Sequence, residues 1–246
     1  MISQQYLVKV REILNHLEQT QMSAIERAAE LIAKALTHQG LVYCAELGHG
    51  LQADFINRAG GLAAIQSFTF NVSVASSVPR CYQNRPRGDH WEQDLETVRF
   101  AVQSSNLRSG DVMLVSSVSG RNRVPVELAL ACRAKGIRVI GFTSLAYSRV
   151  VAALHPSGRR LAEVVDVVID LGVPLGDAAL DVPGYDAKLI PLSGVALDVA
   201  GWMMLGRVME MMAERGQPLT VFSSINLEGG EERYRQSQEQ YEKRGF

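Results

Sequence analysis

The sequence has little of what marks a secreted, membrane-bound or nucleic-acid-binding protein. Its three cysteines, Cys44, Cys81 and Cys132, form neither a C-x-x-C pair nor a zinc-finger spacing, so we expect reduced thiols. Lys and Arg number 25 against 26 for Asp and Glu, which leaves no positive excess to attract nucleic acid or an anionic membrane. Long apolar runs are missing too, because Asp198 interrupts the most apolar stretch, Val195–Leu205. We therefore expect a cytoplasmic protein that binds neither membranes nor nucleic acids.

What is present is the composition of an ordinary globular protein. Hydrophobic residues make up 47% of the 246 residues and charged residues 21%, which is enough apolar material for one large core. We expect a single domain with three parts. Residues 1–40 form helices that pack on the core or on a partner subunit, residues 41–216 form an α/β core, and residues 217–246 form a C-terminal extension.

Short apolar runs alternate along the chain with segments in which apolar residues recur at helical spacing. The runs predict strands at Leu41–Ala45, Ile65–Val72, Asp111–Ser117, Ile137–Phe142 and Val164–Asp170. Two amphipathic helices open the chain, and further helices are predicted at about Leu51–Ala59, Trp91–Leu107, Pro125–Lys135, Gly194–Arg215 and Gly230–Lys243, with an irregular segment at Leu171–Leu192. This alternation predicts a parallel sheet covered by helices on both faces, with ligands bound beyond the carboxyl ends of the strands.

The turn after the third predicted strand has the chemistry of an anion site. Free N–H groups at the start of the next helix, the helix dipole and small hydroxyl side chains all favour a phosphate. The expected phosphate ligands are Ser116, Ser117, Ser119, Gly120, Arg121 and Asn122. Arg123 could add charge in the same way as Arg121, either to the ligand or to a neighbouring subunit. The alternative is a tight connection with a serine cap and no ligand.

This turn resembles the phosphate turn of the sugar isomerase (SIS) family, Ser-x-Ser-Gly-x-Thr/Ser. Ser117, Ser119, Gly120 and Asn122 occupy the motif positions, with asparagine in place of the last hydroxyl residue. A similarity to a bacterial subgroup of SIS proteins continues through Arg58-Ala59-Gly60-Gly61, His155-Pro156-Ser157-Gly158, Gly176-Asp177-Ala178 and Asn226-Leu227-Glu228-Gly229-Gly230. The resemblance implies a three-layer αβα sandwich with a five-stranded parallel sheet. It also implies a sugar phosphate bound near the subunit interface of a homodimer or homotetramer.

The loop after the first strand departs from the family pattern. Residues 46–52 contain no hydroxyl side chain, so the backbone of Gly48 and Gly50 is what remains for ligand contacts. The same loop matches the dinucleotide motif G-x-G-x-x-A, but no Asp or Glu lies between Asp54 and Asp89 to hold a ribose. We therefore expect no nicotinamide cofactor, and nothing in the pattern requires a metal ion or another cofactor.

Isomerisation of an aldose to a ketose needs a base beside the carbonyl carbon and a group that shuttles protons. The candidate bases are Glu46, at the end of the first strand, and Glu127, after the phosphate turn, where the helix dipole alone also favours a carboxylate. His49 and His155 are candidate proton shuttles, although a lone loop histidine is commonly only solvated. Three functions stay open: a phosphosugar isomerase, a sensor that binds without chemistry, and a lyase or etherase acting on an amino-sugar phosphate.

Overall fold

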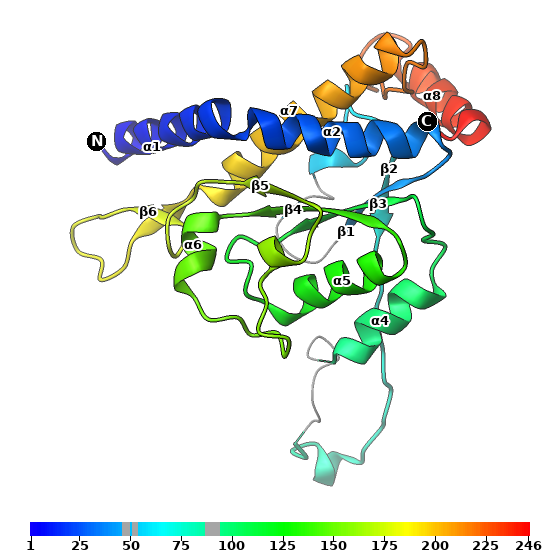
Figure 1. Ribbon diagram of the computed structural model, residues 1–246. Helices are drawn as coiled ribbons and strands as arrows, with labels where there is room; N and C mark the ends of the chain where they lie inside the picture. Colours follow the sequence, from blue (N-terminus) through cyan, green and yellow to red (C-terminus); the bar gives the residue numbers. More distant parts are fainter. Residues whose placement is uncertain (46–49, 51–53, 87–93) are drawn as a thin grey trace.

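The computed structural model describes residues 1–45, 50, 54–86 and 94–246, and its centre is a β-sheet (Figure 1). The strands are β1 (Val42–Ala45), β2 (Ile65–Phe68), β3 (Val112–Ser116), β4 (Arg138–Thr143) and β5 (Val167–Asp170). They lie in the order β2-β1-β3-β4-β5, and every neighbouring pair is parallel. The five-stranded parallel sheet is therefore confirmed.

Helices cover both faces of the sheet. On one face lie α2 (Met22–Thr37) and α7 (Ser193–Glu214), and on the other lie α4 (Leu95–Ser104) and α5 (Arg123–Ala134) (Figure 1). Successive side chains of a strand point to opposite faces of the sheet, so β3 contributes side chains to the apolar cores on both faces. Its Leu114 packs in the core with α2 and α7, whereas its Val115 packs with α4 and α5, and both are fully buried. The three-layer αβα architecture follows from this alternation.

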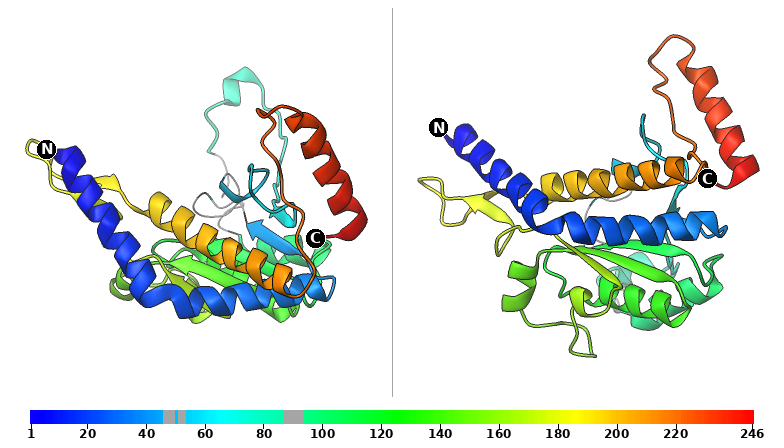
Figure 2. Two further views of the ribbon diagram at one scale, coloured as in Figure 1. Left: turned by 90° about the horizontal axis from the view of Figure 1, so that it is seen from above. Right: turned by 45° about the horizontal axis from the view of Figure 1, so that its top comes forward.

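The two N-terminal helices join without a break. α1 (Ile2–His16) continues through a π-helical turn, η1 (Leu17–Gln21), into α2. At this turn the side-chain Oε1 of Gln21 accepts the N–H of Asp170 at 2.9 Å, which ties the helices to the end of β5. α1 then extends beyond the sheet (Figure 2).

The segment before α7 is more regular than expected. It contains the antiparallel pair β6 (Ala178–Leu180) and β7 (Leu189–Pro191), so the prediction of an irregular segment is wrong over these residues. Asp177, just before β6, accepts the N–H of Ser193 at 2.8 Å and its hydroxyl at 2.5 Å. Asp177 thereby provides an acceptor for the first N–H group of α7, which has no partner within the helix.

The remaining elements are α6 (Leu145–Val150), α8 (Gly230–Arg244) and the short 3-10 turns η2 (Arg80–Tyr82) and η4 (Leu161–Glu163). The segment that carries η2 extends away from the sheet (Figure 1). No helix in the described part of the chain combines the length and the apolar character that crossing a bilayer requires.

Candidate functional site

The turn at residues 116–122 lies where the order of the strands reverses. From β1 the chain adds β2 on one side and then β3, β4 and β5 on the other. The carboxyl ends of β1 and β3 therefore flank the crevice at which open parallel sheets bind ligands. The turn starts at Ser116, the last residue of β3, and ends at Asn122, which directly precedes α5. We call residues 116–122 the phosphate turn.

The fold uses only some of the backbone donors of the phosphate turn. The N–H of Ser117 donates to a carbonyl of β4 at 3.0 Å, and that of Gly120 donates to the carbonyl of Ser117 at 2.9 Å. Within the described residues, the N–H groups of Val118, Ser119 and Asn122 have no acceptor. Unpaired donors at a helix start are the groups that bind anions in proteins.

The side chains of the phosphate turn add further polar groups without partners. Ser116 is fully buried, and its hydroxyl has no hydrogen-bond partner among the described residues. The hydroxyl of Ser119 lies 3.5 Å from the N–H of Arg121, at the limit of a hydrogen bond. Asn122 occupies the N-cap position of α5 in an extended conformation, but its side chain does not cap the helix. A buried hydroxyl without a partner is unfavourable and calls for an explanation such as a ligand.

Two arginines flank the end of the phosphate turn. Arg121 and Arg123 are both half-buried, and the Nε of each is buried with no hydrogen-bond partner in the part of the chain that the structure describes. Neither forms an ion pair with any residue that the structure describes. Guanidinium groups without a carboxylate partner, next to free N–H groups, make this end of α5 electropositive.

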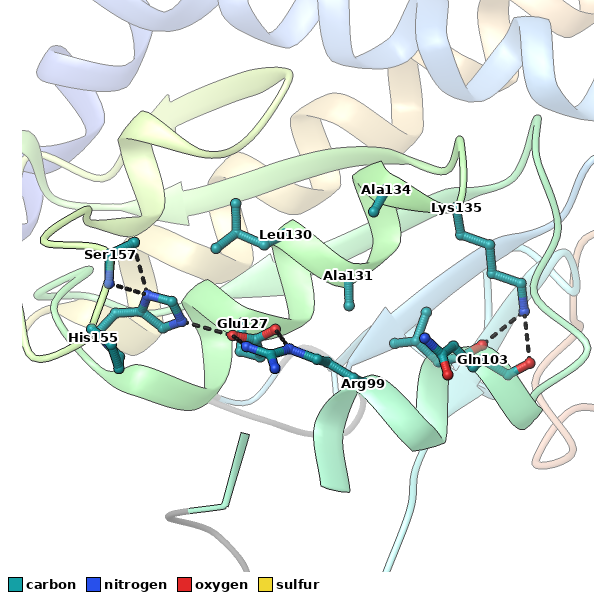
Figure 3. A pocket seen from close by; sticks show the side chains of 11 residues that line it. Arg99, Gln103, Glu127, Leu130, Ala131, Ala134, Lys135, His155 and Ser157 are labelled. Atoms are coloured by element: carbon teal, nitrogen blue, oxygen red, sulfur yellow. Dashed lines mark hydrogen bonds and ion pairs between the residues drawn. The ribbon is translucent and has the colours of Figure 1, made fainter. Parts of the chain in front are cut away.

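Glu127 and His155, both candidates for proton transfer, lie together on the α4–α5 side of the sheet (Figure 3). Arg99 of α4 donates to the Glu127 carboxylate through Nε at 2.6 Å and through Nη2 at 3.2 Å. The Nε2 of His155 lies 2.8 Å from the second carboxylate oxygen of Glu127. Glu127 and His155 are only 3% and 6% exposed. Both carboxylate oxygens are thus engaged inside the protein.

The neighbours of His155 determine its tautomer. The N–H of Ser157 donates to Nδ1 of His155 at 3.1 Å, so Nδ1 carries a lone pair and Nε2 carries the proton that it donates to Glu127. Burial acts to raise the pKa of the Glu127 carboxyl, but the hydrogen bonds from Arg99 and His155 outweigh it, and the pKa lies below its ordinary value. Glu127 is therefore a carboxylate at neutral pH, and a weak base.

A groove of about 720 Å³ runs beside this cluster, between α4 and α5. Apolar side chains of the two helices, among them Val102 and Leu130, form part of its wall. Lys135 also lines it, but its ammonium already donates to the carbonyl of Val102 at 2.7 Å (Figure 3). None of residues 116–122 lines this groove, so it is separate from the phosphate turn.

A pair of carboxylates, Asp54 and Asp198, is a feature that the sequence analysis did not predict. Asp198 lies on α7, and its carboxyl interacts electrostatically with that of Asp54. Burial, and then the charge of Asp54, raise the pKa of Asp198. The pair is held in place because Phe55 packs edge-on against Trp202 of α7, with ring centroids 5.3 Å apart. One signal was available: a charged residue inside the most apolar stretch of the chain.

Three predicted site residues, Glu46, Gly48 and His49, lie outside the described residues. Asp54 follows them in the chain, and Arg58 pairs with it through Nη2 at 3.1 Å from Oδ1. Among the described residues, no three His, Cys, Asp or Glu side chains come together as a set of metal ligands.

Relatives of this chain match it over nearly its whole length. A UPF0309 protein of Caldanaerobacter subterraneus subsp. tengcongensis is 31% identical over 244 residues, which is 97% of each chain. A UPF0309 protein of Streptomyces coelicolor is 32% identical over 244 residues, 98% of this chain and 96% of the relative.

Solved structures share the fold at low sequence identity. Phosphoheptose isomerase of Neisseria gonorrhoeae has a TM-score of 0.54 at 15% identity and covers 87% of this chain and 100% of its own. A phosphoheptose isomerase of Francisella tularensis has a TM-score of 0.53 at 13% identity and covers 83% of this chain and 95% of its own. The family model of the SIS domain matches residues 5–144, from α1 through β3, the phosphate turn and β4. The chain belongs to the SIS domain family, and its relatives are the UPF0309 proteins of bacteria.

Proposed function

We propose that this protein binds a sugar phosphate, with the phosphate on the phosphate turn, and converts it between aldose and ketose forms. The observation that carries the proposal is the surplus of donors there. The free N–H groups, the unpaired hydroxyl of Ser116 and the guanidinium groups of Arg121 and Arg123 all lack partners among the described residues. A phosphate dianion would accept from the free N–H groups of the turn and from the arginine side chains at the positive end of the α5 dipole.

The family supports the same class of substrate. Two solved structures that share the fold are phosphoheptose isomerases, so the fold is compatible with chemistry on a phosphorylated sugar. Fold alone does not assign a reaction. We extend only the substrate class, sugar phosphates, to this chain, and the position of the phosphate turn at the reversal of strand order supports that step.

The reaction requires a proton to move between neighbouring carbon atoms. A base removes the proton at carbon 2 of the aldose, and the electrons of that C–H bond form a C1=C2 double bond while the C1 carbonyl π bond breaks and its oxygen takes up a proton, which gives the enediol. The O2 hydroxyl then loses its proton as the C2 carbonyl forms, the C1=C2 double bond breaks, and carbon 1 receives the proton from the base. We propose Asp198, paired with Asp54, for this transfer. A carboxyl whose pKa is raised next to an ionised one can serve as acid and base in turn. Glu46 and His49, which precede Asp54, are further candidates.

A sensor is the second candidate function. The oxygens of Glu127 and both ring nitrogens of His155 are engaged in hydrogen bonds, so neither residue is free to accept a proton from a sugar. This observation favours a protein that recognises a sugar phosphate without transforming it. Action as a lyase or etherase on an amino-sugar phosphate would need an acid–base pair of the same kind.

We also propose that the chain assembles as a homodimer or homotetramer with the site near an interface. Leu7 and Val8 on α1 are about half exposed, at 51% and 50%, on a helix that extends beyond the sheet. Burying such side chains against a second copy would remove apolar surface from water. Light scattering of the purified protein measures the oligomeric mass.

Two measurements separate these functions. Thermal unfolding with a panel of hexose, heptose and amino-sugar phosphates identifies ligands, because a compound that binds only the folded state raises the melting temperature. Exchange of the carbon-2 proton of such a ligand with deuterated water then reports proton transfer. We expect Asp198→Asn to keep the thermal shift and to slow exchange by about 10²-fold or more.

Each other outcome has a definite meaning. A sugar phosphate that binds without any exchange supports the sensor, and exchange that is unchanged in Asp198→Asn contradicts our choice of base. If no phosphorylated sugar shifts the melting temperature, the proposed function is wrong.

A further inference from the structure

A second segment of the chain, residues 154–161, is bonded directly to the phosphate turn. The N–H of Leu154 donates to the carbonyl of Arg121 at 3.0 Å, and the N–H of Leu161 donates to the carbonyl of Gly120 at 2.8 Å. The carbonyl of Arg121 and the free N–H of Asn122 belong to one planar peptide unit and point in opposite directions. The bond from Leu154 therefore sets the direction in which the Asn122 donor points.

His155 anchors this segment to the helix that follows the phosphate turn. It is the residue next to Leu154, and its ring bridges the backbone of Ser157 and the carboxylate of Glu127 on α5. Arg99 of α4 compensates the charge of Glu127. These contacts thus connect residues 154–161 to α5 and α4. The ring of His155 has one orientation because both of its nitrogens are hydrogen-bonded (Figure 3).

From these contacts we infer that Glu127 and His155 are positioning residues that hold the phosphate turn in its anion-binding conformation. We call the pair the Glu127–His155 latch. It acts through the Leu154 bond to the carbonyl of Arg121, and not by transferring a proton, since its polar atoms are engaged inside the protein. The inference rests on the proposed function, because it assigns the latch to the site that binds the phosphate.

If the latch only stabilised the fold, its loss would have the same effect on phosphate binding as the loss of another partly buried carboxylate that binds an arginine. Asp166 provides that comparison. Its side chain is 11% exposed, bonds to Arg138 at 2.8 Å, and accepts the N–H of Val139 at 2.9 Å. Its carboxylate also lies 3.6 Å from Arg133, near the C-terminal end of α5. Asp166 directly precedes β5, so it lies at the amino ends of the strands, whereas the phosphate turn lies at their carboxyl ends. Asp166→Asn is therefore the matched control.

The first test is the binding of inorganic phosphate and of the sugar phosphate that most stabilises the parent protein, measured by titration calorimetry. We expect His155→Ala to raise the dissociation constant about tenfold, and Asp166→Asn to leave it unchanged at a similar loss of melting temperature. His155→Gln should restore most of the affinity, because its amide N–H reaches Glu127 from the position of Nε2. Equal affinities for the parent and His155→Ala would overturn the inference.

The second test needs no ligand, so it separates failure of the latch from failure of the proposed function. Hydrogen exchange of the full-length protein reports the protection of the Leu154 and Leu161 amides. Opening of the latch should reduce that protection about tenfold in His155→Ala but not in Asp166→Asn. Unchanged protection overturns the latch even if sugar phosphates bind. Reduced protection in a protein that binds no phosphorylated compound supports the latch and rejects the proposed function.

Discussion

At the scale of single residues, Gly120 bends the chain inside the phosphate turn with a φ of 63°. The sequence motif makes this glycine one of the expected phosphate ligands. The structure adds a second reason, because a Cβ at this position would lie 2.9 Å from the hydroxyl of Thr143 and 3.0 Å from that of Ser148. The fold itself thus requires glycine at position 120, whether or not a ligand is bound.

Replacing Gly120 by alanine should therefore destabilise the protein more than an ordinary glycine substitution at positive φ. We expect a loss of roughly 2 to 4 kcal/mol in the free energy of unfolding, from the left-handed conformation and the crowding together. Gly216 is the control, because it has a φ of 68° and nothing within 4 Å of its added Cβ. Urea unfolding measures both variants. A Gly120→Ala protein no less stable than Gly216→Ala would contradict the crowding.

Glu127 makes the stability of the fold depend on pH. Its pKa in the folded protein lies below the ordinary value of 4.5, so its stabilising contribution is complete above pH 4.5 and is lost as the pH falls through the folded-state pKa. We expect the difference in unfolding free energy between the parent and Glu127→Gln to be largest at neutral pH and to shrink below pH 4.5. Urea unfolding across that range measures it. If the difference in unfolding free energy between the two proteins grows as the pH falls, this account of Glu127 is wrong.

The sequence indicated functional residues where the chemistry is local. The polar groups of the phosphate turn are consecutive in the chain, so their pattern alone predicted a strand, a turn and a helix start, and the structure confirms that arrangement. Arg99 with Glu127, and Asp54 with Asp198, are distant in sequence and meet only through packing of α4 on α5 and of Phe55 on Trp202. Spacing along one sequence does not indicate which residues pair, although Asp198 by itself was marked by its place in the most apolar stretch of the chain.

At the scale of elements, buried strands were predicted well because a parallel strand covered on both faces is continuously apolar. β3 and β4 lie within one residue of their predicted bounds. The link between α1 and α2 was missed, because a π-helical turn shifts the apolar pattern without any helix-breaking residue. The β6–β7 hairpin was missed because each of its strands has only three residues, and the segment that joins them, residues 181–188, contains the turn residues Asp, Pro and Gly.

Asp177 gives a test at this scale, since it joins the hairpin to α7. Its carboxylate accepts the N–H groups of Leu192 and Ser193, at 3.1 and 2.8 Å, in place of a cap within the helix. We expect Asp177→Ala to lower the free energy of unfolding by about 1 to 2 kcal/mol, as loss of a helix cap does. Asp177→Asn, which keeps an acceptor oxygen and tolerates the φ of 67°, should lose less. Equal losses for the two variants would contradict the capping role.

At the scale of the whole molecule, the position of the site follows from topology. Because β1 lies between β2 and β3 and all three strands are parallel, the carboxyl ends of β1 and β3 lie side by side, and the family model spans both strands. Sequence alternation predicted the parallel sheet and its layers. The division into one domain of three parts and the oligomeric state stay predictions, since they depend on surfaces and contacts that no local pattern encodes.

The central claim is that the phosphate turn binds the phosphate of a sugar phosphate. Titration calorimetry of the parent, Ser119→Ala and Asn122→Ala with a stabilising sugar phosphate and with the same sugar lacking phosphate tests it most directly. Ser23→Ala, an exposed serine on α2, is the control. We expect binding that requires the phosphate and that weakens about tenfold or more in the two turn variants only. Equal affinity of all four proteins for the sugar phosphate, or equal affinity for the unphosphorylated sugar, would contradict the claim.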